Sequence, residues 1–341
     1  MIEIDGSYLE GGGQILRTAT ALSAVTKKPC HVFNIRKGRG KPGLSTQHLL
    51  GIQTLVKIAN AQLEGDYLGS EEITFSPGEI NQGETSINVK IETAGSITLV
   101  LQTLILPALF ASTPIKIIFE GGATDTFFSP TIDYFRFVFL KILEKIGGKV
   151  EVNILKRGYY PEGGAKIEVK VSSVKIGNLN LTERGSLKKI SAISGASEIL
   201  KDKKVAEGQM AGVREILGKL NLPFEEKIEY YQTQCPGSQV CLVAEFENTV
   251  IGADNLGKLD KRAEDVGKEA ALELLKEQKS NTCLDKHSTD QILPFMALSP
   301  EKSQITTSEI TKHTQTNVWV IEKFLEGKFE IRNNIISWNP F

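Results

Sequence analysis

The sequence lacks any apolar run long enough to cross a membrane. The stretch 99–111 is mostly apolar, but Gln102 and Pro107 interrupt it, and a spanning helix needs about 20 predominantly apolar residues. The first five residues, Met-Ile-Glu-Ile-Asp, are too polar for a secretory signal. These absences predict a cytoplasmic protein without a membrane partner.

Cysteine and histidine are also scarce. The four cysteines contain neither a Cys-x-x-Cys pair nor a zinc-binding pattern. Cys235 and Cys241 could form a disulfide across the Pro-Gly turn between them, but free thiols are the commoner state in a cytosolic chain. Histidine chemistry has only four candidates, which are His31, His48, His287 and His313.

Acidic residues are missing from one long stretch. Residues 11–63 contain no aspartate or glutamate but eight lysines and arginines, four of them within residues 36–41. Glycines interrupt this cationic run, and a helical apolar pattern follows it, with Ser45 as a candidate N-cap. Clustered cations, close backbone approach and a helix N-terminus together predict a phosphate site. A solvated basic loop is the alternative interpretation.

A similar order of elements recurs three times along the chain. Strand, glycine-rich turn, helix, strand, loop and helix occur first before Gly65, and then around Gln102, where Ser129 would cap a helix that opens with Pro130. The order returns near the C-terminus. Three glutamines expected to open the first helix of each unit, Gln14, Gln102 and Gln291, are separated by 88 and 189 residues. The second interval is about two periods long, so we expect an additional module within it.

The additional module is predicted at residues 185–280. Its expected elements are a strand at 188–193, mostly helix at 197–219, an antiparallel strand pair at 227–232 and 240–247, and a helix at 261–276. Residues 1–184 and 281–341 would then form one larger domain of three units. The fold class expected from this organisation is α+β.

His313 is the histidine best placed for chemistry. It is expected in the loop before a helix at about 316–325, at the position that the cationic stretch occupies in the first unit. Equivalent loops of repeated units often converge on one site, so His313 would face the phosphate-binding residues. Imidazole is largely neutral and nucleophilic near pH 7, which suits such a position.

Five motifs are spread over the chain. They are Glu-Gly-Gly-Gly-Gln-Ile-Leu-Arg at 10–17, Arg-x-x-Arg-x-Lys-Pro-Gly-Leu-x-x-Gln-His at 36–48, Ala-Gly-Ser at 94–96 with Gln102, Gly-Tyr-Tyr-Pro-x-Gly-Gly at 158–164, and the pair Asp290-Gln291. With these motifs the sequence resembles the RNA 3'-terminal phosphate cyclases over nearly its whole length.

The resemblance implies both an architecture and a reaction. The architecture is three repeats of a unit with two helices and a four-stranded sheet, as in enolpyruvyl transferases, with a smaller α/β domain inserted before the third repeat is complete. The reaction uses ATP to convert an RNA 3'-terminal phosphate to a 2',3'-cyclic phosphodiester. A histidine takes AMP from ATP, AMP passes to the RNA 3'-phosphate, and the neighbouring 2'-hydroxyl displaces it.

The resemblance also implies roles for individual residues. His313 would be the nucleophile, and Glu10 would bind the divalent cation, Mg²⁺ or Mn²⁺, that accompanies ATP. The phosphates of ATP or RNA would be held by Arg17, Arg36, Arg39, Gln47 and His48. The nucleoside of ATP would lie among Gln102, Pro130, His287, Asp290 and Gln291, although His287 stands where a bacterial member has tyrosine.

Two alternatives share the expected fold. One is a non-catalytic, RNA-binding ribosome-assembly factor, a paralogue that lacks the nucleophilic histidine, whereas this chain has His313 together with Glu10 and Arg17. The other is an enolpyruvyl transferase, which forms no covalent nucleotide. The motif at 36–48 and the Asp290-Gln291 pair favour a cyclase over an enolpyruvyl transferase.

Overall fold

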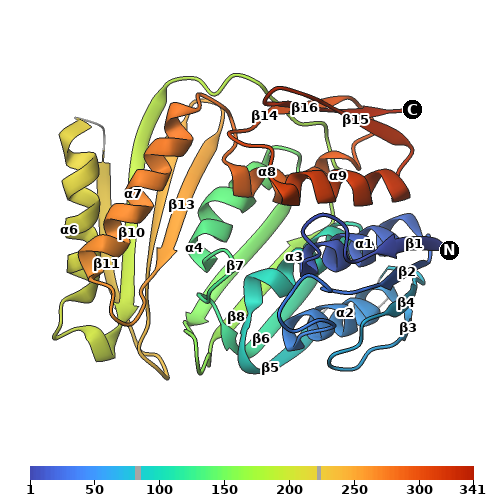
Figure 1. Ribbon diagram of the computed structural model, residues 1–341, viewed down its shortest axis with the longest axis horizontal. Helices are drawn as coiled ribbons and strands as arrows, with labels where there is room; N and C mark the ends of the chain where they lie inside the picture. The colour runs from blue at the N-terminus through green and yellow to red at the C-terminus, as the bar shows by residue number, and fades with distance from the viewer. Residues whose placement is uncertain (81–85, 221–223) are drawn as a thin grey trace.

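The computed structural model describes residues 1–80, 86–220 and 224–341. It contains four four-stranded sheets, each accompanied by helices (Figure 1). Both termini lie at one end of the molecule, and the sheet that contains β10 and β13 lies at the other (Figure 1). None of the helices in these ranges is long and apolar enough to cross a membrane.

The first unit alternates strands and helices before it ends in a hairpin. Its elements are β1 (Ile2–Asp5), α1 (Gly13–Thr26), β2 (Cys30–Phe33), α2 (Thr46–Ala59), β3 (Gln62–Glu64) and β4 (Ile73–Ser76). The strand order is β1-β2-β4-β3. β1 and β2 are parallel, and the other two pairs are antiparallel.

The second unit repeats this arrangement. Its elements are β5 (Ser86–Ser96), α3 (Ile97–Leu109), β6 (Ile115–Ala123), α4 (Ile132–Tyr134), a π-helical turn at Phe135–Phe139, α5 (Leu140–Glu144), β7 (Lys149–Lys156) and β8 (Lys166–Ser172). The strand order β5-β6-β8-β7 matches that of the first unit. The prediction for its second helix was wrong in detail: the cap is Thr131, whose side chain accepts from Tyr134 N, and not Ser129.

The third unit is divided by the intervening segment. It consists of β9 (Asn180–Leu181), then α8 (Lys286–Met296), β14 (Ser303–Thr306), α9 (Lys312–Phe324), β15 (Gly327–Arg332) and β16 (Ile335–Pro340). Read from β9, its strand order β9-β14-β16-β15 is again the same. The predicted fold class, with three similar units, is therefore confirmed. His313 belongs to the first turn of α9, capped by Thr311, rather than to the preceding loop as predicted.

The intervening segment, here called the inserted module, contains β10 (Leu187–Ser197), α6 (Val205–Leu217), β11 (Phe224–Tyr231), β12 (Ser238–Phe246), β13 (Val250–Leu256) and α7 (Ala263–Lys279), with short 3₁₀ turns at Glu198–Leu200 and Gly218–Leu220. The predicted pairing of β11 with β12 was wrong. Both strands flank β10, and β11 is parallel to it because α6 carries the chain back before β11 begins. The strand β13 was not predicted.

Two hydrophobic clusters lie in the described part of the chain. The larger one takes side chains from all three units, and the smaller one lies between the sheet of the inserted module and its helices α6 and α7. The inserted module thus has a hydrophobic cluster of its own. The division into domains at residues 185 and 280 stays a prediction. All four cysteines are buried free thiols, so Cys235 and Cys241 are not bridged.

Helix α3 explains how the larger core and the site are joined. Every residue of α3 is buried except Gln102, which is expected for a helix surrounded by others. It packs against α1, α2 and α8. Gln102, the sixth residue of α3, lines the cleft described below together with Leu99, Ile105 and Leu106 of the same helix. The prediction that Gln102 and Gln291 open their helices, as Gln14 does, was wrong.

Candidate active site

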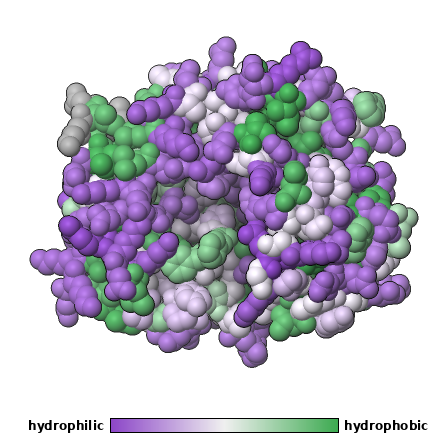
Figure 2. All heavy atoms as spheres, in the orientation of Figure 1, coloured by the Kyte–Doolittle hydropathy of each residue, from purple (hydrophilic) through white to green (hydrophobic). Residues whose placement is uncertain are grey.

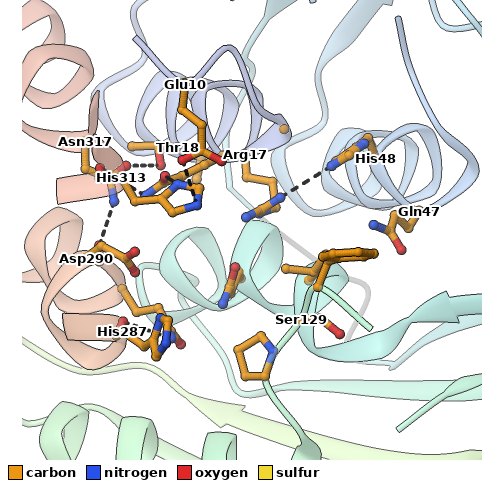
Figure 3. Close-up of a pocket in the computed structure, with 18 of the residues that line it drawn as sticks. Glu10, Arg17, Thr18, Gln47, His48, Ser129, His287, Asp290, His313 and Asn317 are labelled. Atoms are coloured by element: carbon orange, nitrogen blue, oxygen red, sulfur yellow. Dashed lines mark hydrogen bonds and ion pairs between the residues drawn. The ribbon is translucent and has the colours of Figure 1, made fainter. Parts of the chain in front are cut away.

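A cleft of about 1020 Å³ lies where the three units and the inserted module meet. The molecular surface is visibly hollowed between them (Figure 2). All twelve site residues expected from the sequence line this cleft. Gln47 and His48 lie on one side of it, and His287 and Asp290 on the other (Figure 3).

His313 is held by side chains of the first unit. Its Nδ1 contacts Gln14 Oε1 at short range, and its Nε2 lies 2.8 Å from Glu10 Oε2. The Gln14 amide also donates to the backbone oxygen of His313, at 3.4 Å. The imidazole is nevertheless 40% exposed, so a reactant in the cleft can reach it.

Glu10 lies between His313 and Arg39, a cation of the loop at residues 36–41. One carboxylate oxygen faces His313 Nε2, and the other contacts the guanidinium of Arg39. Burial alone would raise the pKa of Glu10. The hydrogen bond and charge of His313 and the charge of Arg39 outweigh it, so the pKa lies below its usual value. Glu10 is therefore anionic near neutral pH.

His48 and Arg17 form a second polar pair. Burial, and then the charges of Arg17, Arg36 and Arg39, hold the pKa of His48 well below its usual value. The neutral ring lies 2.7 Å from Ser45 Oγ through Nδ1 and 3.4 Å from Arg17 Nη1 through Nε2. Because Arg17 can only donate, Nε2 is the acceptor and Nδ1 carries the proton. Burial lowers the pKa of Arg17 to about 10, so it remains charged.

The glycines at 12 and 13 allow these side chains to approach the start of α1. A Cβ atom on Gly13 would lie 2.0 Å from His48 Nε2, and one on Gly12 would lie 2.9 Å from Arg39 Nη2. The glycine run of the first motif is therefore required by packing against the second motif.

Arg36 and Gln47 line the cleft but also have structural partners. Arg36 Nη1 donates to the backbone oxygen of Gly43 at 2.7 Å, which closes the cationic loop. Gln47 Oε1 accepts from Ser96 N at 3.0 Å. The second contact places Gln47 beside the N-terminus of α3, and its amide nitrogen is the part that a ligand could use.

The opposite side of the cleft combines apolar and buried polar groups. Burial raises the pKa of Asp290 to about 6, against the charges of His313, His287 and Arg17. Gln291 donates to the backbone oxygen of His287 at 3.0 Å, and its own Oε1 is a buried acceptor without a partner among the described residues. The backbone oxygen of Pro130 accepts from Thr98 Oγ1 at 2.9 Å. An uncharged ring with hydrogen-bonding edges suits this surface.

Sequence reasoning missed several residues that shape the site. Gln14 served only to estimate the spacing between the repeated units. Its position in the first motif could have indicated a role in the site. Asn317 donates to the backbone oxygen of Asp290 at 2.6 Å and accepts from Thr18 at 2.7 Å, so it joins α1, α8 and α9. Asp254 of β13 lines the cleft from the inserted module and accepts from Thr131 N at 2.7 Å. Nothing in the local sequence around Asp254 signals this contact.

A dedicated metal centre is not apparent in the described ranges. No group of three or more histidine, cysteine, aspartate or glutamate side chains converges there. Glu10 is the carboxylate closest to the cationic loop, and its lowered pKa keeps it charged. A single carboxylate fits a cation that takes most of its ligands from phosphate oxygens and water.

Comparison with known proteins shows the family to which this chain belongs. The model of the family described as RNA 3'-terminal phosphate cyclase matches residues 8–331. The chain belongs to this family. It is 46% identical to the RNA 3'-terminal phosphate cyclase of Pyrococcus furiosus, over 98% of this chain and 96% of that protein. It is 43% identical to the one of Saccharolobus islandicus, over 97% and 96%, and 44% identical to the one of Pyrococcus abyssi, over 98% and 96%.

Membership of the RNA 3'-terminal phosphate cyclase family confirms the resemblance inferred from the motifs. The protein is accordingly a ligase-type enzyme, and the two alternatives of the same fold are not supported.

Proposed function

We propose that this protein converts the 3'-terminal phosphate of an RNA to a 2',3'-cyclic phosphodiester at the expense of ATP, through an adenylate on His313. The observation that carries the proposal is the position of the His313 imidazole. It is accessible in the cleft, and it is oriented by Gln14 and Glu10. The same cleft is lined by Arg17, Arg36 and Arg39, the arginines that would hold phosphates.

Nε2 is the nitrogen proposed to react. Gln14 Oε1 is an acceptor for an N–H at Nδ1, so the ring has its lone pair on Nε2 once Nε2 has lost the proton that it donates to Glu10. Nε2 would attack the α-phosphorus of ATP, and the bond to the pyrophosphate oxygen would break with its electron pair. The ring of the adenylate is then cationic, and the Nδ1–H bond to Gln14 would stabilise that charge.

The remaining steps are two further displacements at phosphorus. An oxygen of the RNA 3'-phosphate would attack the AMP phosphorus and release His313. The 2'-hydroxyl of the same ribose would then attack the 3'-phosphorus, lose its proton and expel AMP. Arg17, Arg36 and Arg39 can neutralise the charge on the phosphates, because each guanidinium offers paired donors that match phosphate oxygens.

Glu10 is the residue proposed to bind a divalent cation with ATP. Such an ion would neutralise part of the triphosphate charge. The carboxylate now accepts from His313 and Arg39, so the cation and His313 would share the same two oxygens. The nucleoside would occupy the opposite side of the cleft, among Gln102, Pro130, His287, Asp290 and Gln291.

The proposal is tested by labelling with α-labelled ATP. The protein with a divalent cation should acquire acid-labile, alkali-stable label, and His313→Ala should abolish it. His31→Ala is the matched control, because His31 pairs with Glu3 on a strand outside the cleft. Unchanged labelling of His313→Ala would show that another residue is the nucleophile.

A second measurement tests the RNA substrate. An oligoribonucleotide with a 3'-phosphate should become resistant to phosphatase as its end cyclises. The same oligonucleotide with a 3'-hydroxyl should remain unchanged, and its consumption would contradict the proposed reaction.

A further inference from the structure

Large apolar side chains are exposed at one edge of the cleft. Phe128 is fully exposed, Leu259 is 95% exposed and Tyr160 is 57% exposed. Together with Phe127 they form a surface that we call the aromatic rim. Exposed apolar groups gathered in one place commonly mark a binding surface.

The rim is built by three turns from different parts of the chain. The rings of Phe127 and Tyr160 meet edge to face, with centroids 6.1 Å apart, and Lys258 Nζ lies 5.5 Å from the centroid of Phe127. Leu259 follows Lys258 at the tip of the turn after β13. The second unit and the inserted module therefore contribute to one surface.

The turn that carries Phe128 is fixed rather than loose. Ser129 Oγ donates to the backbone oxygen of Thr126 at 2.9 Å, and Phe128 has a left-handed φ of +62°. Behind it, the buried Arg157 guanidinium binds Asp125 at 3.0 Å and Asp133 at 2.6 Å. The backbone of a residue other than glycine is strained when its φ is positive. Such strain is concentrated at functional sites.

The rim runs from inside the cleft to outside it. Phe127 and Phe128 line the cleft, whereas Tyr160 and Leu259 do not. An occupant that covers the whole rim must therefore leave the cleft. ATP bound at the proposed nucleoside side would stay within the cleft, but an RNA whose 3' end reaches His313 has to emerge from it.

The aromatic rim and the cations of residues 36–41 lie on different walls of the cleft. The bases and the phosphates of a bound RNA would therefore face different walls. The rim's turns carry Lys258 and Arg262 but also Glu162 and Asp260, so charge alone would not hold RNA there. The cations lie on the wall made by residues 36–41. Single-stranded RNA pairs these two surfaces, because its bases stack on aromatic side chains while its backbone follows cationic groups.

We propose that the aromatic rim stacks the bases of single-stranded RNA next to its 3'-phosphate, with Phe128 as the main stacking residue. This assignment rests on the proposed function, since it takes RNA to be the substrate. Stacking needs only the flat face of a base, so it would hold RNA ends of any sequence.

The test is the binding of a fluorescent single-stranded oligoribonucleotide with a 3'-phosphate, measured by anisotropy without ATP. Phe128→Ala should weaken binding roughly tenfold, as expected for one lost base–aromatic stack. Phe128→Trp should retain the affinity. Phe341→Ala is the matched control, because Phe341 is also an exposed phenylalanine but does not line the cleft.

An abasic substitution identifies the stacked base. Removal of the base that contacts Phe128 should weaken binding to the unmodified protein but not further weaken binding to Phe128→Ala. Labelling of Phe128→Ala with α-labelled ATP should be unchanged. This separates the inference from the proposed function, since the binding assay reports the rim even if no adenylate forms.

Three results would overturn the inference. Equal RNA binding by Phe128→Ala and the unmodified protein would remove the stacking role. A loss of adenylate labelling with unchanged RNA affinity would assign Phe128 to ATP. Self-association that Phe128→Ala abolishes, with unchanged RNA affinity, would make the rim a contact between protein chains.

Discussion

Glu10 and Asp290 are carboxylates of the same cleft with opposite electrostatic behaviour. The pKa of Glu10 is lowered because His313 and Arg39 outweigh its burial, and the pKa of Asp290 is raised to about 6 because burial outweighs its cationic neighbours. The difference is that only Glu10 has its partners in direct contact. Glu10 is in direct contact with His313 and Arg39, whereas Asp290 interacts with His313, His287 and Arg17 through space.

The same contrast separates the two sides of the cleft. The phosphate side is built from charged side chains of the first unit and from His313. The proposed nucleoside side is built from uncharged groups and the buried Asp290 of the other two units, with Asp254 from the inserted module. We infer that the phosphate side acts through charge and the nucleoside side through shape and hydrogen bonds. Three substitutions test this difference.

The largest effect is expected at Glu10. Glu10→Gln keeps the shape of the side chain but removes its charge, so adenylate formation should fall roughly 10³-fold if a cation-binding carboxylate is lost. Initial rates of labelling at several cation concentrations measure this. Glu3→Gln is the matched control, because Glu3 is exposed and pairs with His31 outside the cleft. A rate within threefold of the unmodified protein would remove Glu10 from the phosphate side.

A smaller effect is expected at Arg39. Arg39→Ala removes a charge-assisted contact worth about 1.5–3 kcal/mol, so the affinity for 3'-phosphate RNA should fall roughly 10- to 100-fold. The dependence of affinity on salt should also become shallower, since one fewer cation meets the phosphates.

Lys37→Ala is the control for this substitution. Lys37 belongs to the same cationic loop but does not line the cleft, so its removal should change the affinity less. Equal losses for the two variants would mean that only the overall field of the loop matters, and not a contact at Arg39.

The smallest effect on activity is expected at Asp290, where stability should change instead. The folded protein holds the Asp290 proton more tightly than an unfolded chain does, because the pKa rises from 3.8 to about 6. The free energy of unfolding should therefore fall as the pH rises from about 4 to about 6, and stay lower above that. Asp290→Asn has no such proton, so it should be more stable than the unmodified protein by up to about 3 kcal/mol at about pH 8.

Denaturant unfolding between about pH 4 and pH 8 measures this effect. The stability gain of Asp290→Asn should shrink toward about pH 4, where both side chains are neutral. A gain that does not depend on pH would show that the Asp290 carboxylate is not held in its neutral form by burial.

Much of the fold could be predicted because its signals are local. Apolar periodicity located most helices and strands, and the repeated order of elements revealed three units. Some failures were local, such as the cap at Ser129 and the unpredicted strand β13, and others were tertiary. The pairing of β11 and β12 depends on where α6 returns the chain, and β9 is only two residues long. Neither property is encoded in a short stretch of sequence.

The sequence alone determined which residue types gather at the site. Its motifs contained nine of the twelve expected site residues, and the other three, Pro130, His287 and His313, lie outside them. Only the tertiary structure decided how they act together. The contacts of His313 with Gln14 and Glu10, the entry of Asp254 from the inserted module and the opposite pKa shifts of Glu10 and Asp290 all depend on segments that meet only in the folded chain. Burial and through-space charge are properties of that packing, so no local pattern could reveal them.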